Sequence, residues 1–480
     1  MALLLALEAI FMLPACLIGI FYKEFTCVTS YLQTIGIILV TALILWKITK
    51  NPKQGFYVKD GMVLTGLAWI VMSIFGAFPF YFSGEIPSYI DALFETVSGF
   101  TTTGSSILTN VEGLSKSLLF FRSFTHWIGG MGVLVFLLAI VPLSGKNQGY
   151  TLHILRAESP GPSVGKLVPK MKQTASILYL IYISLTIINI IFLLIGKMPL
   201  FDALCTAFGT AGTGGFGIKN DSLASYSPYI QNVTTIFMAL FGVNFSCYYL
   251  LLLKRFKDVF EDEELRLYLG IILVSVALIT FDCMNYHLFD TISEALRHVS
   301  FSVSSIITTT GFATEDFNIW PMFSKTILII LMFSGACAGS TGGGIKVARI
   351  LLLFKSARRN IKQTLHPNQI SKIRVNHSVI DEKIIKNTNC YLTIYTALIV
   401  LSILIISMDN FSFETNFSAV MATFNNIGPG LDVVCPSGNF SSFSSLSKLV
   451  MIFDMLAGRL EIIPILCLFD LHTYKKISVN

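Results

Sequence analysis

Ten long apolar segments recur along this 480-residue chain, and they set the strongest limit on its fold. They lie at 1–22, 28–46, 61–82, 117–143, 173–196, 230–253, 267–281, 323–354, 388–408 and 443–469. A helix needs about 20 apolar residues to cross the hydrocarbon core of a bilayer. Only 13% of the residues are charged and the mean hydropathy is +0.71, which excludes both a set of soluble domains and a disordered chain. The sequence therefore predicts an all-α polytopic membrane protein in a lipid bilayer.

The first apolar segment lacks a basic region before it and contains Glu8, so we expect a retained helix rather than a cleaved signal peptide. If the ten segments alternate across the membrane, 25 of the 34 Lys and Arg residues fall on one side. Positive charge marks the cytoplasmic side, which predicts that both termini are cytoplasmic. The basic residues therefore reflect topology, and we expect no binding of nucleic acid.

The opposite, outer face carries 15 acidic residues against eight basic ones, and such a field raises the local concentration of cations. On the inner side, the basic loops 144–172 and 346–386 hold more positive charge than orientation requires. We expect these two loops to form a docking surface for a cytosolic protein.

Four shorter apolar stretches, at 90–100, 200–211, 292–307 and 416–424, are too short to span a membrane and favour re-entrant helices. Each leads into a polar loop of the pattern polar, any, glycine, any, small. These loops, named here filter loops 1 to 4, are 102–106, 213–217, 309–313 and 426–430.

The filter loops resemble a degenerate form of the potassium-channel sequence Thr-Val-Gly-Tyr-Gly, in which four loops supply rings of backbone carbonyls that replace an ion's hydration shell. The ends of four short helices would add a negative potential that favours a cation. The predicted ion-binding residues are Thr102, Thr103, Gly104, Thr213, Gly214, Gly215, Thr309, Thr310, Gly311, Asn426, Ile427 and Gly428.

Further motifs accompany these loops: Arg122-Ser-Phe-Thr-His-Trp-Ile-Gly-Gly-Met-Gly132, Ala157-Glu-Ser-Pro-Gly-Pro162, Gly335-Ala-Cys-Ala-Gly-Ser-Thr-Gly-Gly-Gly-Ile-Lys346, Asn425-Asn-Ile-Gly-Pro-Gly430 and Gly458-Arg-Leu-Glu461. With all of them in this order, nearly the whole chain resembles the Trk/Ktr/HKT superfamily of potassium transporters, and within it the membrane subunit of bacterial Trk-type uptake systems. Filter loop 2, with Gly214-Gly215-Phe216-Gly217, departs most from the others but keeps the aligned glycine.

The resemblance implies four pseudo-repeated helix–pore-helix–helix units around one pore, preceded by two extra transmembrane helices. The expected boundaries are 1–57 for the N-terminal hairpin and 58–146, 147–256, 257–362 and 363–480 for the four units. It also implies potassium uptake across the bacterial inner membrane, with K⁺ bound at the filter residues and with no covalently bound cofactor. The expected partners are a second copy of the chain, forming a homodimer with one pore per protomer, and a cytosolic nucleotide-binding regulatory ring of the TrkA type. The nucleotide (NAD, ATP or ADP) would bind to that ring and not to this chain.

The apolar segment 321–354 is longer than one span requires, and its middle contains a cluster of glycines. Each glycine costs about 1 kcal/mol in a helix interior, which favours an unwound loop beside protein or water. The alternative is a helix-packing face of small residues; a phosphate-binding loop fits poorly because no strand precedes it. The resemblance implies that 335–346 is an intramembrane gating loop, with Gly335, Gly339, Gly342, Gly343, Gly344 and Lys346 as gate residues.

Arg459 is the only basic residue in the interior of the last apolar segment, where a charge is costly and suggests a function. Asp454 and Glu461 are five and two positions away, so neither shares its helix face. The resemblance implies that Arg459 lies in the pore below the filter as an electrostatic barrier and part of the gate. A salt bridge to another helix is the alternative.

The remaining features point to no second activity. The seven histidines lack metal-ligand spacing and His126 fits a structural role, whereas the acidic run 261–264 is most simply a solvated helix start. The cysteines lie mostly in apolar stretches and fit packing roles. An intramembrane enzyme would need a nucleophile or paired acids inside the apolar segments, and none is evident. A sodium-passing or sodium-coupled member of the superfamily, and H⁺ or Na⁺ symport as against passive conduction, stay open at this point.

Overall fold

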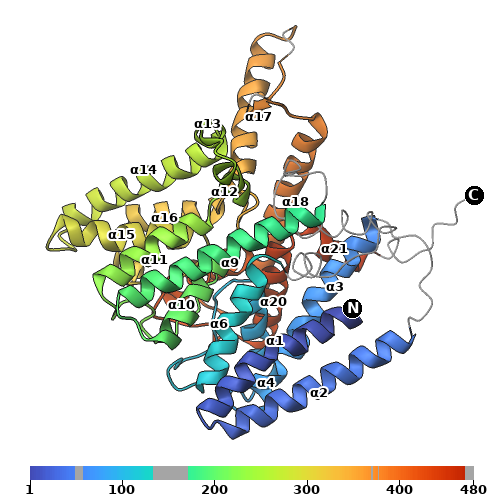
Figure 1. Ribbon diagram of the computed structural model, residues 1–480. Helices are drawn as coiled ribbons and strands as arrows, with labels where there is room; N and C mark the ends of the chain where they lie inside the picture. The colour runs from blue at the N-terminus through green and yellow to red at the C-terminus, as the bar shows by residue number, and fades with distance from the viewer. Residues whose placement is uncertain (49–57, 133–170, 369–370, 377, 471–480) are drawn as a thin grey trace, which may run out of the picture.

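The computed structural model describes residues 1–48, 58–132, 171–368, 371–376 and 378–470 (Figure 1). The regular secondary structure within these residues is helical apart from one small hairpin. The helices are α1 (Ala2–Phe21), α2 (Phe25–Ile48), α3 (Val58–Gly76), α4 (Phe78–Phe82), α5 (Tyr89–Phe100), α6 (Lys116–Gly130), α9 (Met171–Ile195), α10 (Leu200–Gly212), α11 (Pro228–Phe241), α12 (Phe245–Leu252), α13 (Phe256–Phe260), α14 (Glu263–Asn285), α15 (Ile292–Ile307), α16 (Met322–Ser334), α17 (Val347–Leu365), α18 (Glu382–Ile406), α19 (Phe413–Phe424), α20 (Ser445–Arg459) and α21 (Ile463–Phe469). Short 3₁₀ turns lie at η1 (Phe317–Ile319), η2 (Ser407–Asp409) and η3 (Asp432–Val434), and the hairpin pairs β1 (Arg374–Val375) with β2 (Ser378–Val379).

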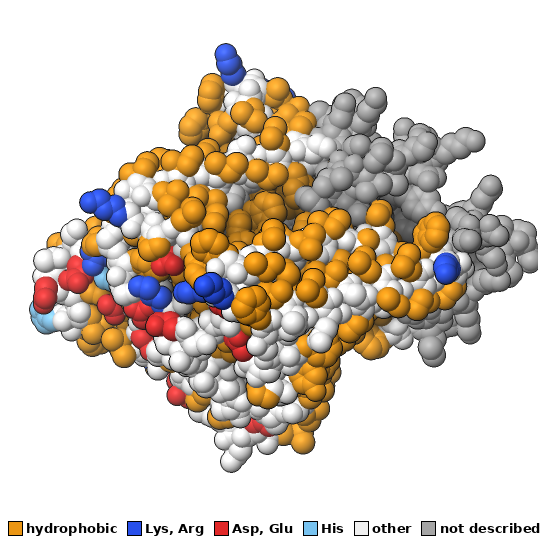
Figure 2. Space-filling model, turned by 60° about the horizontal axis from the view of Figure 1, so that its bottom comes forward, with side chains coloured by type: hydrophobic (Ala, Val, Ile, Leu, Met, Phe, Trp, Pro, Cys, Tyr) orange, Lys and Arg blue, Asp and Glu red, His pale blue; other side chains and the backbone are white. Residues whose placement is uncertain are grey.

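Six helical stretches of the described chain are long and apolar enough to cross a membrane: Ala2–Phe21, Phe25–Ile48, Lys59–Phe82, Ala175–Ile195, Glu263–Asn285 and Glu382–Asp409. Their outward side chains are apolar, and Leu17, Leu43, Leu273 and Leu404 are each more than half exposed. Figure 2 shows hydrophobic side chains over the flanks of the molecule, with Asp and Glu gathered in one polar region of the face in view. This distribution is the one expected where lipid surrounds the flanks.

Three of the predicted spans are broken rather than continuous. The segment 230–253 forms α11 and α12, which bend by 90° at their junction. The segment 443–469 forms α20 and α21, and 321–354 contains α16 and the start of α17 on either side of an unwound loop. The second half of the segment 117–143 lies outside the described residues.

The four predicted short helices are confirmed as α5, α10, α15 and α19. Each is followed by a filter loop and then by a second helix, which packs on the next short helix in the chain: α6 on α10, α11 on α15, α16 on α19 and α20 on α5. The last pairing closes the circle, because it returns from the end of the chain to its first short helix.

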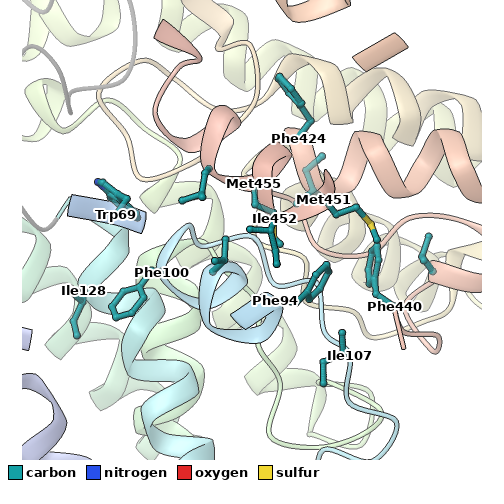
Figure 3. Close-up of a cluster of buried hydrophobic side chains, with 14 of the residues drawn as sticks. Trp69, Phe94, Phe100, Ile107, Ile128, Phe424, Phe440, Met451, Ile452 and Met455 are labelled. Carbon is teal, nitrogen blue, oxygen red and sulfur yellow. The ribbon is translucent and has the colours of Figure 1, made fainter. Parts of the chain in front are cut away.

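The core around α5 shows how this closure is packed (Figure 3). Phe94 of α5 is fully buried, and its ring centroid lies 5.7 Å from that of Phe440. Met451, Ile452 and Met455 of α20 belong to the same buried cluster. Burial of each such side chain stabilises the fold by roughly 1.5–3 kcal/mol, so the contact between the two ends of the chain is well anchored.

Candidate functional site

All four short helices end in the same backbone geometry. The residue two places before the aligned glycine is left-handed, with φ of 56° at Thr102, 54° at Thr213, 58° at Thr309 and 55° at Asn426. The next amide donates to the carbonyl five residues back, as in Thr103 N to Ser98 O at 2.9 Å, which is the Schellman ending of a helix. Threonine adopts this conformation at a cost of roughly 1–2 kcal/mol. Strain repeated at four equivalent places marks a functional site.

The aligned glycines also have positive φ, from 73° at Gly215 to 103° at Gly428. Each glycine lies against the carbonyl oxygen of the residue that precedes the aligned glycine of the next filter loop, and a Cβ there would meet that oxygen. The pairs are Gly104 with Gly214, Gly215 with Thr310, Gly311 with Ile427, and Gly428 with Thr103. Eight of the twelve predicted ion-binding residues make these contacts, which run from loop to loop in one closed ring. Each of the other four, Thr102, Thr213, Thr309 and Asn426, directly precedes one of the contacting residues in the chain.

A hollow of about 140 Å³ opens onto this ring. All four aligned glycines line it, together with Arg122 and polar residues of the loops that follow the filter loops. Most of the lining is backbone and uncharged side chains, and it also contains two basic residues, Lys219 and Arg122, the second of which is paired with Glu95. A hollow of this size suits a small hydrated ion better than a large organic ligand.

The predicted unwound loop at 335–346 is confirmed between α16 and α17, and the alternative of a helix-packing face is excluded because these residues are not helical. The amide of Gly343 donates to the hydroxyl of Thr309 at 2.6 Å, so the loop contacts filter loop 3 directly. The same loop occupies the bend between α11 and α12, where Cys337 N donates to Gly242 O and Phe245 N donates to Gly339 O, each at 3.1 Å. Those bonds satisfy backbone groups that the 90° bend leaves free.

Arg459 fastens the 335–346 loop to α6. Its guanidinium donates to the carbonyl of Thr341 at 2.8 Å and to those of Gly129 and Gly130 at 2.6 Å each. Lys346 donates within the loop to the carbonyl of Gly342. The predicted gate residues therefore lie together, and Arg459 contacts backbone carbonyls of both the loop and α6.

The two acids considered as partners of Arg459 are engaged elsewhere. Glu461 pairs with Arg349 of α17 at 2.5 Å. Asp454 accepts a hydrogen bond from Ser402 of α18 at 2.7 Å. Their spacing from Arg459 in the sequence predicted that neither shares its helix face, and both acids have other partners in the structure.

The expectation for the acidic run 261–264 is wrong in part. Glu264 is 9% exposed, and its carboxylate accepts a hydrogen bond from the amide of Ala338 at 2.6 Å, at the start of the 335–346 loop. Glu263 pairs with Lys355 of α17 and accepts a hydrogen bond from the amide of Asn376 at 3.2 Å. The only sequence signal was a carboxylate in the first turn of an apolar helix, 74 residues from its partner.

Sequence reasoning also missed the role of Glu95 and Arg122. Glu95 was one of the 15 acidic residues assigned to the outer face, and Arg122 was one of the eight basic residues there and the first residue of a family motif. The structure buries both, with Arg122 Nε 2.5 Å from Glu95 Oε1 beside filter loops 1 and 2.

The predicted docking surface is only partly within the described residues. Loop 144–172, with the motif 157–162, lies outside them except for its last two residues. The helix α17 projects from the body beside the first turns of α18 (Figure 1). Arg358 and Lys362 on it are exposed, whereas Arg359 pairs with Glu382.

Known proteins match this chain over almost its full length. The sequence profile of the TrkH family, described as cation transport protein, matches residues 30–478. The Trk system potassium uptake protein TrkH of Salmonella typhimurium is 37% identical over 448 residues, which cover 92% of this chain and 91% of that protein. The Trk system potassium uptake protein TrkG of Escherichia coli is 33% identical, with coverages of 97% and 95%.

A solved structure is also similar. The crystal structure of the potassium transporter TrkH from Vibrio parahaemolyticus aligns with a TM-score of 0.88 and 30% sequence identity, covering 99% of this chain and 98% of that one.

Proposed function

Since this chain belongs to the TrkH family and is the membrane subunit of a Trk potassium uptake system, we propose that its four filter loops form one ion pathway lined by backbone carbonyls. The protein is a multi-pass membrane transporter of potassium and not an enzyme. The observation that carries the proposal is the closed ring of glycine–carbonyl contacts from Gly104 around to Gly428.

Four pseudo-repeated units, 58–146, 147–256, 257–362 and 363–480, surround this pathway and follow the hairpin 1–57. The circular packing of each second helix on the next short helix supports this division. The C-terminal ends of α5, α10, α15 and α19 then converge on one axis. Their partial negative charges favour a cation next to the ring.

Potassium binds at carbonyls of the twelve filter residues in place of its hydration water. Glycine is required at the four aligned positions because a side chain would fill the space of a neighbouring carbonyl. Transport therefore favours potassium and rubidium over sodium, with modest discrimination because the four loops differ in sequence.

The loop 335–346 gates the pathway on the inner side of the ring. It lies against filter loop 3 through Gly343, and Arg459 both holds it and places a positive charge near the pathway. Release of the loop opens the way to the cytoplasm.

The protein works in the bacterial inner membrane as a homodimer with both termini in the cytoplasm. A cytosolic nucleotide-binding ring of the TrkA type controls the gate and binds NAD, ATP or ADP itself. The exposed basic residues Arg358 and Lys362 of α17 support docking on that side.

Uptake of radioactive rubidium into proteoliposomes tests the proposal. We expect uptake that potassium inhibits more strongly than sodium does, because the carbonyl ring fits the larger ions. Equal inhibition by the two ions would contradict the proposed filter. A protonophore distinguishes passive conduction, in which uptake persists, from proton symport, in which it falls.

A further inference from the structure

Filter loop 2 has the least internal support of the four. Hydroxyl groups of filter loop 1 and its flank bond to one another, Thr101 to Thr103 at 2.7 Å, and the same pair recurs in filter loop 3 as Thr308 and Thr310 at 2.8 Å. In filter loop 4, Asn426 donates to the hydroxyl of Thr103 at 2.9 Å. In filter loop 2, the hydroxyl of Thr213 donates to the carbonyl of the preceding residue, Gly212. A hydrogen bond between adjacent residues does not link the loop to any other part of the described chain.

The backbone of filter loop 2 is also the most adaptable. It contains Gly214, Gly215 and Gly217 around a single large side chain, Phe216. Glycine has more accessible backbone conformations than any other residue, so a run of glycines defines carbonyl positions poorly by itself. Something outside the loop has to hold it.

Two side chains of α6 contact Phe216. The guanidinium carbon of Arg122 lies 3.5 Å from the Phe216 ring centroid, and Arg122 Nη1 donates to the carbonyl of Gly217 at 2.8 Å. One helical turn later, the ring of His126 lies 4.2 Å from that of Phe216, centroid to centroid. Arg122 and His126 are four residues apart and thus on one face of α6. That face holds the side chain and the last carbonyl of filter loop 2.

The same two residues of α6 are anchored to α5. Arg122 Nε lies 2.5 Å from Glu95 Oε1, and the His126 Nδ1 lies 2.8 Å from the carbonyl of Gly99, so this nitrogen carries the proton. Glu95 in turn accepts from the hydroxyl of Ser106 and the amide of Ile107, both at 3.0 Å. The chain leaving filter loop 1 and the chain leaving filter loop 2 are therefore tied to one buried ion pair.

The charges in this arrangement balance. The side chains of Arg122 and Glu95 are 3% and 0% exposed, and each is the charge partner of the other. Removing one member of a buried pair leaves an uncompensated charge and is strongly destabilising. A balanced pair beside the pathway adds little net repulsion to a passing cation, so its effect on the ion comes through geometry.

We propose that Glu95, Arg122 and Phe216 form a clamp of positioning residues that fixes the carbonyls of filter loop 2 and thereby sets the preference for potassium over sodium. Without the clamp, the three glycines let the loop contract around the smaller ion, and the discrimination falls. The inference rests on the proposed filter and extends it to residues that touch no ion.

The test uses the full-length protein in proteoliposomes and measures the ratio of rubidium to sodium uptake. Phe216→Leu and Arg122→Gln should each lower the ratio about fivefold, equivalent to ~1 kcal/mol. Phe216→Tyr should keep the ratio because it keeps the ring. Arg122→Lys should lower it in part, since an ammonium cannot reproduce the planar fork of a guanidinium.

Asp91→Asn is the matched control. It breaks the ion pair of Asp91 with Lys448, which also ties α5 to a neighbouring helix at 2.6 Å but touches no filter loop. The melting temperature should fall while the uptake ratio stays unchanged. If the contacts of Arg122 only stabilised the fold, Arg122→Gln would likewise lower the melting temperature and leave the uptake ratio unchanged.

An unchanged ratio in Phe216→Leu and Arg122→Gln, with both proteins eluting and melting as folded protein, overturns the clamp. If Arg122→Gln does not fold, Phe216→Leu and Arg122→Lys decide the question, since neither leaves Glu95 without a charge partner. Gly104→Ser in the same assay separates the two levels of the argument. If it shifts the ratio and the clamp variants do not, only the clamp fails; if it also has no effect, the filter itself is wrong.

Discussion

The hydroxyl of Thr309 in filter loop 3 accepts a hydrogen bond from the amide of Gly343 in the gating loop, at 2.6 Å. This bond joins a residue with a strained backbone in filter loop 3 to the 335–346 loop, the segment that we propose as the gate. If that loop moves as proposed, the bond has to break, which would couple the proposed filter to the proposed gate.

Loss of that hydroxyl should loosen the gate. A buried hydrogen bond contributes about 1 kcal/mol, so Thr309→Ala should raise basal uptake about fivefold. Thr309→Ser retains the acceptor and should behave like the unmodified protein. Rubidium uptake in proteoliposomes without the regulator measures both, and equal uptake by the two variants would contradict the coupling.

Arg459→Ala should also raise basal uptake, because three hydrogen bonds from the guanidinium to the gating loop and α6 are lost together with a positive charge. Arg459→Lys separates the two effects, because lysine keeps the charge but cannot make all three hydrogen bonds. Low uptake would indicate that the positive charge keeps the gate closed, and high uptake would indicate that the hydrogen bonds do. Shortening the loop within 339–344 should raise uptake in the same way. Folded, dimeric variants with unaltered uptake would remove this residue and loop from the gate.

The effect of replacing an aligned glycine on the ratio of potassium to sodium uptake should depend on how much space is available for a Cβ at that position. Gly104→Ser should lower the ratio of potassium to sodium uptake without abolishing transport, because its Cβ would displace the carbonyl of Gly214. Gly428→Ser should be milder, since the nearest atom to its Cβ is Thr103 O at 3.0 Å. Gly84 has φ of +77° and open space around it, so Gly84→Ser is a control for backbone strain alone and should leave the ratio unchanged.

Glu264 should act as an anchor of the closed gate. A buried hydrogen bond contributes about 1 kcal/mol, so Glu264→Ala should raise basal uptake about fivefold. Glu263→Ala removes the neighbouring carboxylate, which contacts Lys355 and Asn376 instead of the loop, and should change uptake much less. Comparable increases in the two variants would point to a general loss of structure at the start of α14.

The exposed bases of α17 should be needed by the cytosolic ring. Reversal of charge in Arg358→Glu with Lys362→Glu should weaken co-purification with the regulator and leave membrane insertion intact. Lys254→Glu with Lys257→Glu makes the same change on another exposed stretch of the predicted cytoplasmic side and should have no effect. Retained co-purification of the α17 variant would move the docking surface elsewhere, for example to loop 144–172.

Much of the architecture could be predicted because its signals are local. Segment length and hydropathy identified the short helices, and the clustered glycines of 335–346 predicted an unwound stretch that α16 and α17 do flank. The bend at Gly242 could not be foreseen from one glycine in an apolar run. It depends on carbonyl and amide groups of the gating loop, about 95 residues later in the chain, which bond to the exposed backbone.

The same limit applies to the charged residues. Glu95 and Glu264 each looked like one more acid of a polar surface, since their sequence neighbours offered no partner. Their roles arise from long-range contacts that the fold creates. Glu95 contacts Arg122, 27 residues away, and Glu264 contacts Ala338, 74 residues away. A pattern read along the chain does not reveal such pairs, whereas hydropathy did single out Arg459 as a charge within an apolar segment.

The closed ring of glycine–carbonyl contacts has a genetic consequence. In a channel made of four identical subunits, one codon change alters every quarter of the filter at once. Here each quarter is encoded separately, so mutation can adjust ion preference in small increments and can retain an altered loop such as Gly214-Gly215-Phe216-Gly217 while the other three keep the pathway working.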